Sequence, residues 1–323
     1  MGTRLTIQTP GDFALPRDVC SYGYFLLAPN LWDVESQTLT RPLDLDDGPA
    51  TVTIAQRDGA GSALRAGFDR ALGAAERRTA KAQITRMLRL DEDQSVARAF
   101  HRVDRRWKKS GRSRLFRSPT MFEDVLKTVT SCNVTWSSTV HMNRRLCDVL
   151  GRASTKSAPR SFPTAHKLSR TRPGTLRGRC RVGYRDQRMV DLAKLFRPRG
   201  LRPPECDPAW FEDPGNDDGA VYERLLGLPG IGPYGAANIM QLLGRYSKIA
   251  LDTESVRHGK AVLGFAGTDR QITKKVKEHY EKFGEHKFRS YWFELWRYYE
   301  AKRGPAHLWS RDDVAASFTA SQF

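Results

Sequence analysis

The sequence predicts a mostly α-helical protein that begins with an antiparallel β domain. Short apolar runs separated by turn residues occupy the first part of the chain, which is typical of strands. From Thr79 onward, apolar residues recur every three or four positions, which is typical of amphipathic helices. Stretches rich in Pro, Gly, Ser, Arg and Asp interrupt the helical part and predict loops at 152–182, 197–204 and 213–219.

Four short runs are predicted as successive strands of the β domain, which we place at 1–78. They are the apolar run Tyr-Gly-Tyr-Phe-Leu-Leu-Ala at 22–28, closed by Pro29-Asn30, and the segments 31–33, 39–43 and 50–56.

Helical periodicity then predicts the elements of the remaining chain. They are segments around 84–90 and 96–100, one or two helices within 119–151, a helix at 189–196, and helices filling roughly 220–301. The residues after 302 are predicted as a loosely held tail, 303–323.

Charge points to a polyanionic partner. Lys and Arg total 54 against 36 Asp and Glu, a net charge of +18. An excess of this size favours nucleic acid first and a membrane surface second, with simple solubility as the alternative. Residues 101–120 hold eight Arg or Lys against one Asp, and 152–188 hold eleven against one. We expect both runs to follow a phosphate backbone.

Several classes of protein are disfavoured. No apolar segment approaches the length of a membrane span, and the first residues lack a signal core. The expected location is therefore the cytoplasm or nucleoid of a bacterium, or the nucleus of a eukaryote, and not the secreted fraction. The five cysteines form no CxxC pair or Cys/His cluster, so we expect no disulfide framework, zinc site or iron–sulfur cluster.

The segment Leu228-Pro-Gly-Ile-Gly232 is the most informative motif. Gly230 and Gly232 allow a tight turn, and Pro233 suits the first turn of a following helix. Free N–H groups at such a turn, together with the positive end of the helix, form a seat for a phosphate. We therefore predict a phosphate-binding hairpin that includes Leu228 and Ile231. A tight helix–helix turn without a ligand is the alternative.

Asp252 follows this motif, within Ile249–Arg257. Its ordinary role would be the N-cap of a helix, for which Asp is well suited. The upstream hairpin favours a second role, a carboxylate that faces nucleic acid.

The hairpin followed by Asp252 resembles the helix-hairpin-helix DNA glycosylase superfamily, and the layout is closest to 8-oxoguanine and alkylbase glycosylases. The resemblance implies that Asp252 is the catalytic carboxylate. Glycosylase/lyases of this family carry a Schiff-base lysine eighteen positions before the Asp, and this chain has Tyr234 there. The resemblance further implies two helical subdomains that flank a DNA-binding cleft, one from 79–118 and 245–302 and the other from 119–244.

Two further segments are similar to 8-oxoguanine glycosylase. Thr130-Ser-Cys-Asn133 is similar to the segment with the groove-filling Asn, so Asn133 is the candidate. Val182-Gly-Tyr-Arg185 implies Tyr184 as a wedge in the duplex and Arg185 as the reader of the orphaned base. A core tyrosine and a helix-capping asparagine are the alternatives.

Aromatic residues supply a candidate base pocket. Tyr234, Trp136 and the helix that carries Trp292 and Trp296 could stack on a flipped base, although aromatic stripes at helical spacing are more often core. Asn238 stands where 8-oxoguanine glycosylase has a pocket cysteine, which argues against the same substrate.

Asn238 and Glu294 could each read a base edge or could be structural. Neither alternative is decided by the sequence.

Tyr234 cannot form a Schiff base. The sequence thus predicts a monofunctional DNA glycosylase of base excision repair that flips a damaged base, most simply an alkylated or otherwise modified purine, out of double-stranded DNA. The expected protein is a monomer without a membrane partner and without a cofactor, although the hairpin is a candidate site for a monovalent cation.

The open alternatives are a catalytically silent DNA-binding module and a lyase with a relocated amine. Lys248 and Lys260 are nearby but out of register. The lesion itself and the opposite-base preference are not predicted.

Overall fold

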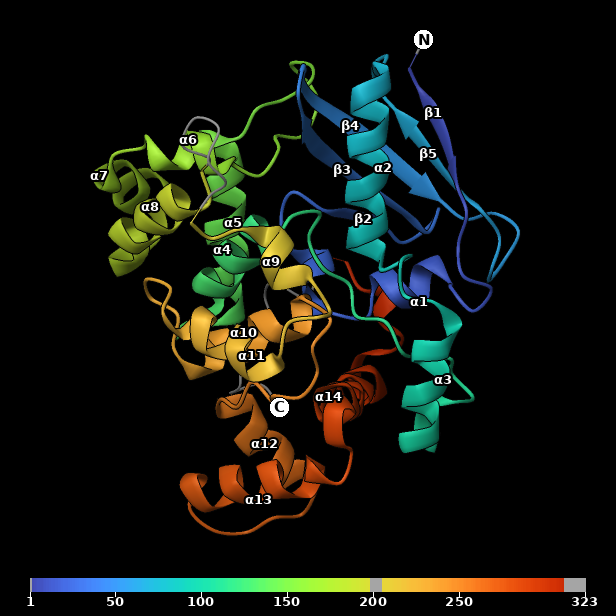
Figure 1. Cartoon of the computed structure of the whole chain (residues 1–323), viewed down its shortest axis with the longest axis vertical. Coiled ribbons are helices and arrows are strands. Elements are labelled where there is room, and N and C mark those ends of the chain that lie inside the picture. Colours follow the sequence, from blue (N-terminus) through green and yellow to red (C-terminus); the bar gives the residue numbers. More distant parts are fainter. Residues whose placement is uncertain (1, 198–204, 311–323) are drawn as a thin grey trace.

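The structure, a computed structural model, describes residues 2–197 and 205–310. It is mostly helical, with one antiparallel sheet in the N-terminal part of the chain, as the sequence predicts (Figure 1). The predicted loop at 197–204 and the end of the predicted tail fall almost wholly outside the described residues. None of the helices in the described ranges is long and apolar enough to cross a bilayer.

The sheet has five strands in the order β1-β5-β4-β3-β2, and all neighbours are antiparallel. The strands are β1 (Arg4–Ile7), β2 (Leu31–Asp33), β3 (Thr38–Leu45), β4 (Gly48–Ala55) and β5 (Leu64–Phe68). Buried residues alternate along β4 and β5, so one face of the sheet carries an apolar layer. Helix α2 (Ala74–Leu88) lies across the sheet (Figure 1). The predicted strands at 31–33, 39–43 and 50–56 are confirmed, and β1 and β5 were not predicted.

The predicted strand at 22–28 is wrong. This segment follows the short helix α1 (Leu15–Val19) and contains the 3-10 turn η1 (Gly23–Leu26). Every residue from Tyr22 to Ala28 is buried. An apolar run that is buried on all sides has no alternation of polar and apolar positions, so periodicity alone does not identify its conformation.

The remaining helices fill most of the chain after the sheet. They are α3 (Gln94–Val103), α4 (Met121–Ser131), α5 (Trp136–Leu150), α6 (Ala165–Ser169), α7 (Pro173–Thr175), α8 (Asp186–Leu195), α9 (Pro208–Glu212), α10 (Asp218–Leu226), α11 (Pro233–Leu242), α12 (Thr253–Ala261), α13 (Asp269–Glu281) and α14 (Lys287–Arg303). The predicted helical region 119–151 is two helices, α4 and α5, and the loop between them borders the site described below.

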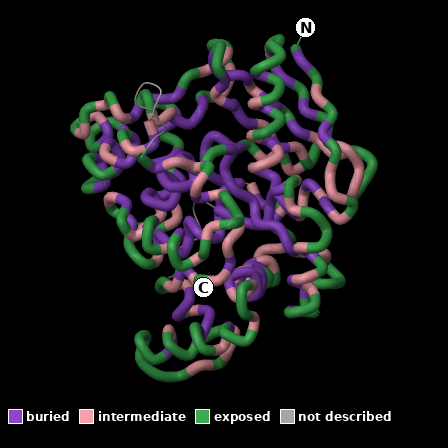
Figure 2. Tube along the Cα trace, viewed as in Figure 1, coloured by how far each residue is buried: buried purple, intermediate pink, exposed green. Residues whose placement is uncertain are grey.

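Two large apolar cores lie side by side. The first joins the sheet and α2 to α12, α13 and α14, and the second lies among α4, α5, α8, α10 and α11. Figure 2 shows the buried trace running through the middle of the molecule, whereas α13 is largely exposed at the end farthest from the sheet. The candidate site lies where elements of the two cores meet.

The first residues of the predicted tail are packed rather than loose. Trp309 is buried, and its ring centroid lies 5.2 Å from that of Trp296. Its indole nitrogen donates to the carbonyl of Gly304 at 2.9 Å. A single large aromatic side chain that buries its surface is enough to fix this end on α14.

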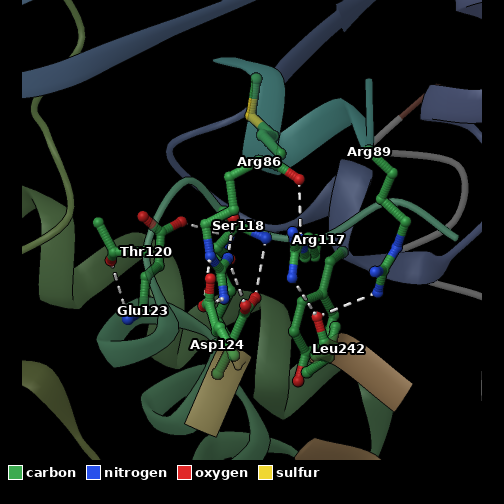
Figure 3. Close-up of polar contacts among 12 residues, drawn as sticks. Arg86, Arg89, Arg117, Ser118, Thr120, Glu123, Asp124 and Leu242 are labelled. Atoms are coloured by element: carbon green, nitrogen blue, oxygen red, sulfur yellow. Dashed lines mark hydrogen bonds and ion pairs between the residues drawn. The ribbon is translucent and has the colours of Figure 1, made fainter. Parts of the chain in front are cut away.

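A buried charge network holds the C-terminal end of α11 (Figure 3). Arg89 and Arg117 each donate to the carbonyl oxygen of Leu242 at 3.0 Å, and Arg86 pairs with Asp124 at 2.8 Å. Carbonyls at the end of a helix lack partners within the helix and attract cations. The network therefore fixes the helix that follows the hairpin from its far end.

The basic run 101–120 is divided between exposed cations and cations in ion pairs. Arg102, Arg105, Lys108 and Lys109 are exposed, so the expectation that this run follows a phosphate backbone stays a prediction. Four of its arginines pair with carboxylates of other segments: Arg106 with Glu294, Arg112 with Glu300, Arg114 with Asp12 and Arg117 with Asp91. Of these four, Arg114 and Arg117 are buried, and carboxylates of other segments compensate their charge.

Candidate active site

The predicted hairpin connects α10 to α11. Leu228 and Ile231 point into the apolar core, with 9% and 6% of their surface exposed. Gly230 has a φ of +77°, and the N–H of Ile231 donates to the carbonyl of Leu228 at 3.1 Å. The two apolar side chains anchor the turn, and the glycine supplies its left-handed residue.

The outer side of the hairpin is open. Gly232 is exposed and has a φ of −99°, so only Gly230 adopts the positive φ that the sequence allowed for both. A Cβ at Gly232 would meet no atom within 4 Å. In the described part of the chain no acceptor is recorded for the N–H groups of Gly230 and Gly232. Free N–H groups at the start of a ten-residue helix can bind an anion such as a phosphate.

Asp252 is both the N-cap of α12 and a group that faces a cavity. Its Oδ1 accepts hydrogen bonds from the backbone N–H groups of Glu254 at 3.0 Å and Ser255 at 3.1 Å. Among the described residues no hydrogen bond to Oδ2 is recorded. The two roles that the sequence left as alternatives are therefore compatible, because the cap occupies one oxygen and leaves the other open.

Ser255 and Tyr291 support this carboxylate. The Ser255 hydroxyl lies 3.4 Å from Oδ1 of Asp252 and accepts a hydrogen bond from the Asp252 N–H at 3.1 Å. Tyr291 OH is 2.9 Å from the Ser255 hydroxyl. Tyr291 comes from α14, so the orientation of the carboxylate is tied to a second helix.

The surroundings raise the pKa of Asp252 to about 6. The residue is exposed at the mouth of the cavity, but protein atoms on the other sides restrict its access to water, and this burial is the main cause. The negative charge of Glu254 adds to the rise, and the cap hydrogen bonds oppose it. At neutral pH the group is mostly a carboxylate in a setting that disfavours its charge.

The cavity has a volume of about 340 Å³, within the size range of small-ligand pockets. Nine aromatic residues from several separate segments line it. They are Tyr22 and Tyr24 near η1, Trp136 at the start of α5, Tyr234 on α11, and Phe288, Tyr291, Trp292, Trp296 and Tyr299 on α14. No lysine or arginine is among the described residues that line it.

The predicted tryptophans all line this cavity. The indole nitrogens of Trp292 and Trp296 donate to the carbonyls of Ser21 and Cys20 at 2.8 and 3.0 Å. Their rings are stacked with centroids 5.3 Å apart. Trp296 is only 2% exposed, so it forms the floor more than the face that a ligand would touch.

Trp136 packs directly onto the backbone of Gly23. A Cβ at Gly23 would lie 3.0 Å from Cη2 of Trp136. Glycine at this position therefore lets the indole close one side of the cavity.

Asn238 and Glu294, the two candidates for reading a base edge, differ in position: Asn238 lines the cavity and Glu294 does not. Both side chains are engaged in hydrogen bonds within the protein. Asn238 accepts a hydrogen bond from Tyr22 OH at 2.6 Å and donates to Thr128 Oγ1 at 3.0 Å and Tyr24 OH at 3.3 Å. Glu294 does not line the cavity and pairs with Arg106 and Tyr280 OH. Asn238 instead fixes the two tyrosines that form the wall.

Tyr234 lies in the cavity wall, half-buried, at the position that the family resemblance assigns to a lysine. Burial and then the Asp252 charge raise the pKa of its phenol well above the usual range, so it stays neutral. Lys248 lies over the Tyr222 ring, and Lys260 pairs with Asp269 at 2.9 Å. Neither of these lysines lines the cavity.

The two predicted wedge residues are both exposed. Asn133 follows α4 with a φ of +53°, a left-handed conformation that Asn tolerates, and the loop it belongs to borders the cavity through Ser131 and Val134. Tyr184 is 53% exposed, so it is not a core tyrosine. Both side chains are available to an external partner.

Arg185 is placed differently from the prediction. It is 4% exposed, and its guanidinium donates to the carbonyls of Val129 at 3.0 Å, Val182 at 3.3 Å and Cys132. Carbonyls at the C-terminal end of α4 need partners, and this arginine supplies them. In this structure Arg185 does not present its donors to a base.

Tyr22, Tyr24 and Glu254 are site residues that the sequence analysis missed. The tyrosines were assigned to a strand, although Gly23 in the middle of the run is unusual for a strand interior. Glu254 lies two residues after Asp252 in the cavity wall and hydrogen bonds with Tyr299 at 2.5 Å. A second acidic residue beside a candidate catalytic carboxylate was the available signal.

The second basic run, 152–188, is largely exposed. Its exposed cationic residues include Arg160, Lys167, Arg170, Arg172, Arg177, Arg179, Arg181 and Arg188. Arg177 pairs with Asp186 at 2.9 Å while 69% of its side chain stays exposed. This run leads directly into the wedge segment and thus places positive charge beside it.

Comparison of the sequence with known protein families gives no match, and comparison with curated proteins gives none. Solved structures do match. The 8-oxoguanine glycosylase/lyase of Clostridium acetobutylicum aligns with a TM-score of 0.64 and 17% identity over 93% of this chain and 98% of that one. The 3-methyladenine DNA glycosylase of Archaeoglobus fulgidus gives 0.62 and 17% over the same shares of the two chains. MBOgg1, solved with a low-affinity DNA ligand, gives 0.67 and 18% over 94% and 97%. The chain thus has the fold of these glycosylases, which confirms the predicted fold class.

Proposed function

We propose that this protein is a monofunctional DNA glycosylase that removes a damaged base from double-stranded DNA in base excision repair. The observation that carries the proposal is the carboxylate of Asp252. Oδ1 accepts the cap hydrogen bonds of α12, no hydrogen bond to Oδ2 is recorded among the described residues, and Asp252 lines an aromatic cavity. Two of the solved structures with this fold are glycosylases that act on different lesions. This similarity supports the same class of reaction here.

The chemistry follows from where the charge develops. A base inside a duplex must be flipped out before its bond to the sugar is reached. Breaking the N-glycosidic bond builds positive charge on the sugar, and a fixed carboxylate stabilises that charge. Oδ2 of Asp252 is the group for this role, and it is also suited to orient the attacking water. The carboxylate is disfavoured in the empty cavity, so interaction with a developing cation relieves an unfavourable state.

The cavity favours a cationic or electron-poor base, such as an alkylated purine. Aromatic faces attract cations, and Asp252 and Glu254 add negative charge to a wall without lysine or arginine among its described residues. Stacking on Tyr22, Trp136 or Trp292 would hold a planar ring system. A neutral oxidised base would gain less from this wall.

Removal without strand cleavage is expected because no lysine is found among the described residues that line the cavity. Tyr234 occupies the place of a lyase lysine, and a phenol forms no Schiff base. The buried Lys127 does not line the cavity. Its Nζ lies 5.7 Å from the centroid of the Tyr24 ring and pairs with Glu123 at 2.7 Å. An amine held in an ion pair outside the cavity is a poor nucleophile.

DNA is expected to bind as a duplex to one monomer. The hairpin N–H groups would hold one phosphate, and the exposed run 152–188 would neutralise further phosphates next to the wedge residues.

The test is a panel of duplexes that each contain one damaged base. Each reaction is split, and one half receives alkali to cut abasic sites. We expect product with at least one alkylated purine, visible only after alkali, and no adduct on borohydride treatment. Strand cleavage without alkali or a trapped adduct would contradict the monofunctional assignment. Tight duplex binding without product from any lesion would identify a DNA-binding module and contradict the enzyme.

A further inference from the structure

The buried Arg185 contacts both predicted wedge segments. It donates to the carbonyl of Cys132, next to Asn133, and its guanidinium lies against the Tyr184 ring. Through its guanidinium it donates to Val129 and Cys132, which are the last-turn and C-cap carbonyls of α4. Asn133 is the next residue along the chain. The position of Asn133 is therefore fixed by an arginine that is distant from it in sequence.

The same guanidinium supports Tyr184. Its central carbon lies 4.4 Å from the centroid of the Tyr184 ring, and that of Arg188 lies 5.4 Å from the same centroid. An arginine at these distances from an aromatic ring is in the range of cation–π attraction. An exposed tyrosine would otherwise rotate freely, so these two contacts restrict it.

Arg188 extends these contacts to the hairpin. A Cβ added to Gly230 would lie 2.7 Å from Cδ of Arg188, so the aliphatic part of the arginine rests on the glycine. The guanidinium end stays exposed. The hairpin, Tyr184 and the loop with Asn133 are therefore connected through two arginines.

We infer that Arg185 is a positioning residue that joins Asn133 and Tyr184 into one preformed DNA wedge, and is not a reader of the base opposite the lesion. The inference rests on the proposed function, because it assumes that the two exposed residues enter a duplex. A wedge that is ordered before binding loses less conformational freedom on insertion.

Two consequences separate this role from base reading. A reader gives discrimination among opposite bases, since a bidentate arginine contact distinguishes one base from the others. A positioning residue acts on the wedge itself, so its loss weakens excision equally whatever base is opposite. It also acts in the free protein, where a reader has no effect.

The first measurement is hydrogen–deuterium exchange of the free protein. In Arg185→Met we expect amide exchange in residues 130–134 and 182–185 to become about tenfold faster, because hydrogen bonds to helix-terminal carbonyls are lost. Arg78→Met, an exposed arginine on α2, is the matched control and should leave both segments unchanged. If Arg185→Met does not fold, Arg185→Lys is measured instead, which keeps the charge but loses the fork of donors. Unchanged exchange in the folded variant would overturn the inference.

The second measurement is single-turnover excision of the preferred lesion opposite each of the four bases. We expect the Arg185 variant to lose rate by about tenfold in all four duplexes, as Tyr184→Ala should. A loss confined to one opposite base would show that Arg185 reads that base and would overturn the inference. If the unmodified protein excises no lesion, the proposed function fails, and exchange in the free protein still decides whether Arg185 orders the two segments.

Discussion

Two arginine-rich runs of similar composition, 101–120 and 152–188, differ in how many of their cations are engaged inside the protein. In the first run Arg114 is 1% exposed, pairs with Asp12 at 2.8 Å and donates to the carbonyl of Glu92 at 2.7 Å. In the second run most of the cationic side chains face solvent, and even the ion-paired Arg177 is largely exposed. The ion-paired half of the first run holds segments together, while its other cations face solvent. The second run presents nearly all of its charge beside the wedge.

The difference lies in the partners and not in the runs themselves. Acidic side chains from the N-terminal segment and from α14 converge on the first run, whereas the second crosses short helices and loops with few acids. Net charge alone thus overstates the surface that is available to DNA. A similar contrast holds for the two hairpin glycines. Gly230 contacts the Arg188 side chain, whereas Gly232 is exposed.

The largest expected effect comes from the first run. Arg114→Ala should lower the free energy of unfolding by about 3 kcal/mol, because the half-buried carboxylate of Asp12 and the carbonyls of Arg89 and Glu92 lose a buried partner. Urea unfolding measures this as a lower midpoint with an unchanged slope. Arg179→Ala in the exposed run is the control and should stay within about 0.5 kcal/mol of the parent. Equal losses in the two variants would remove the distinction between the runs.

The two hairpin glycines should separate stability from DNA binding. Gly230→Ala should cost about 1 to 2 kcal/mol of stability, because an alanine is strained at a φ of +77° and meets the Arg188 side chain. Gly232→Ala has open space and should leave the thermal midpoint unchanged while it weakens duplex binding. Binding by Gly232→Ala equal to that of the parent would show that no phosphate approaches this position.

Each exposed arginine of the second run should contribute a little to DNA affinity. Arg179→Ala should reduce the slope of log K against log salt by about 0.9, the value expected when the protein neutralises one phosphate fewer. Fluorescence anisotropy across a salt series measures this slope. An exposed cation outside both runs, removed by Arg78→Ala, should leave it unchanged. A slope that does not differ between Arg179→Ala and the parent would exclude this part of the run from the interface.

The smallest effect concerns the pH dependence of excision. The carboxylate form of Asp252 is the active one, so the rate should fall as pH drops through about 6. Glu254→Gln removes a negative charge beside Asp252. This change favours the ionised Asp252 and should move the acid limb to lower pH, by about half a unit. A limb that shifts upward or not at all would show that another group titrates.

Because its pKa is raised, ionisation of Asp252 lowers the stability of the fold. Most carboxylates in folded proteins have the opposite effect. The folded state prefers the protonated Asp252, so ionisation at neutral pH costs stability that is absent below pH 4. Asp252→Asn keeps the helix cap, since Asn is as good an N-cap as Asp. The variant should therefore be at least as stable as the parent at pH 7, and any gain should vanish in acid.

Much of the fold was predictable because it depends on local patterns. Alternation predicted β3 and β4, helical periodicity predicted α4, α5, α8 and α11, and the hairpin was predicted from its glycines and prolines. Asp252 was found because its distance from the hairpin is fixed along the chain. These features depend on neighbours within about twenty residues.

The remainder depends on contacts between distant segments, which a single sequence does not reveal. Arg185 binds carbonyls 53 and 56 residues away, so its burial has no local signal. Asn238 is occupied by two tyrosines more than 200 residues earlier in the chain. The segment 22–28 was assigned to a strand because its apolar run resembles one, whereas its buried side chains contact α4, α11 and α14.

The most direct test of the central claim compares Asp252→Asn with the parent on one excised lesion, under single-turnover conditions. We predict a loss in rate of about a thousandfold or more, because the charge that develops on the sugar loses its counter-charge, while affinity for the damaged duplex stays within about threefold. A variant that binds and excises at the rate of the parent would show that Asp252 only caps α12.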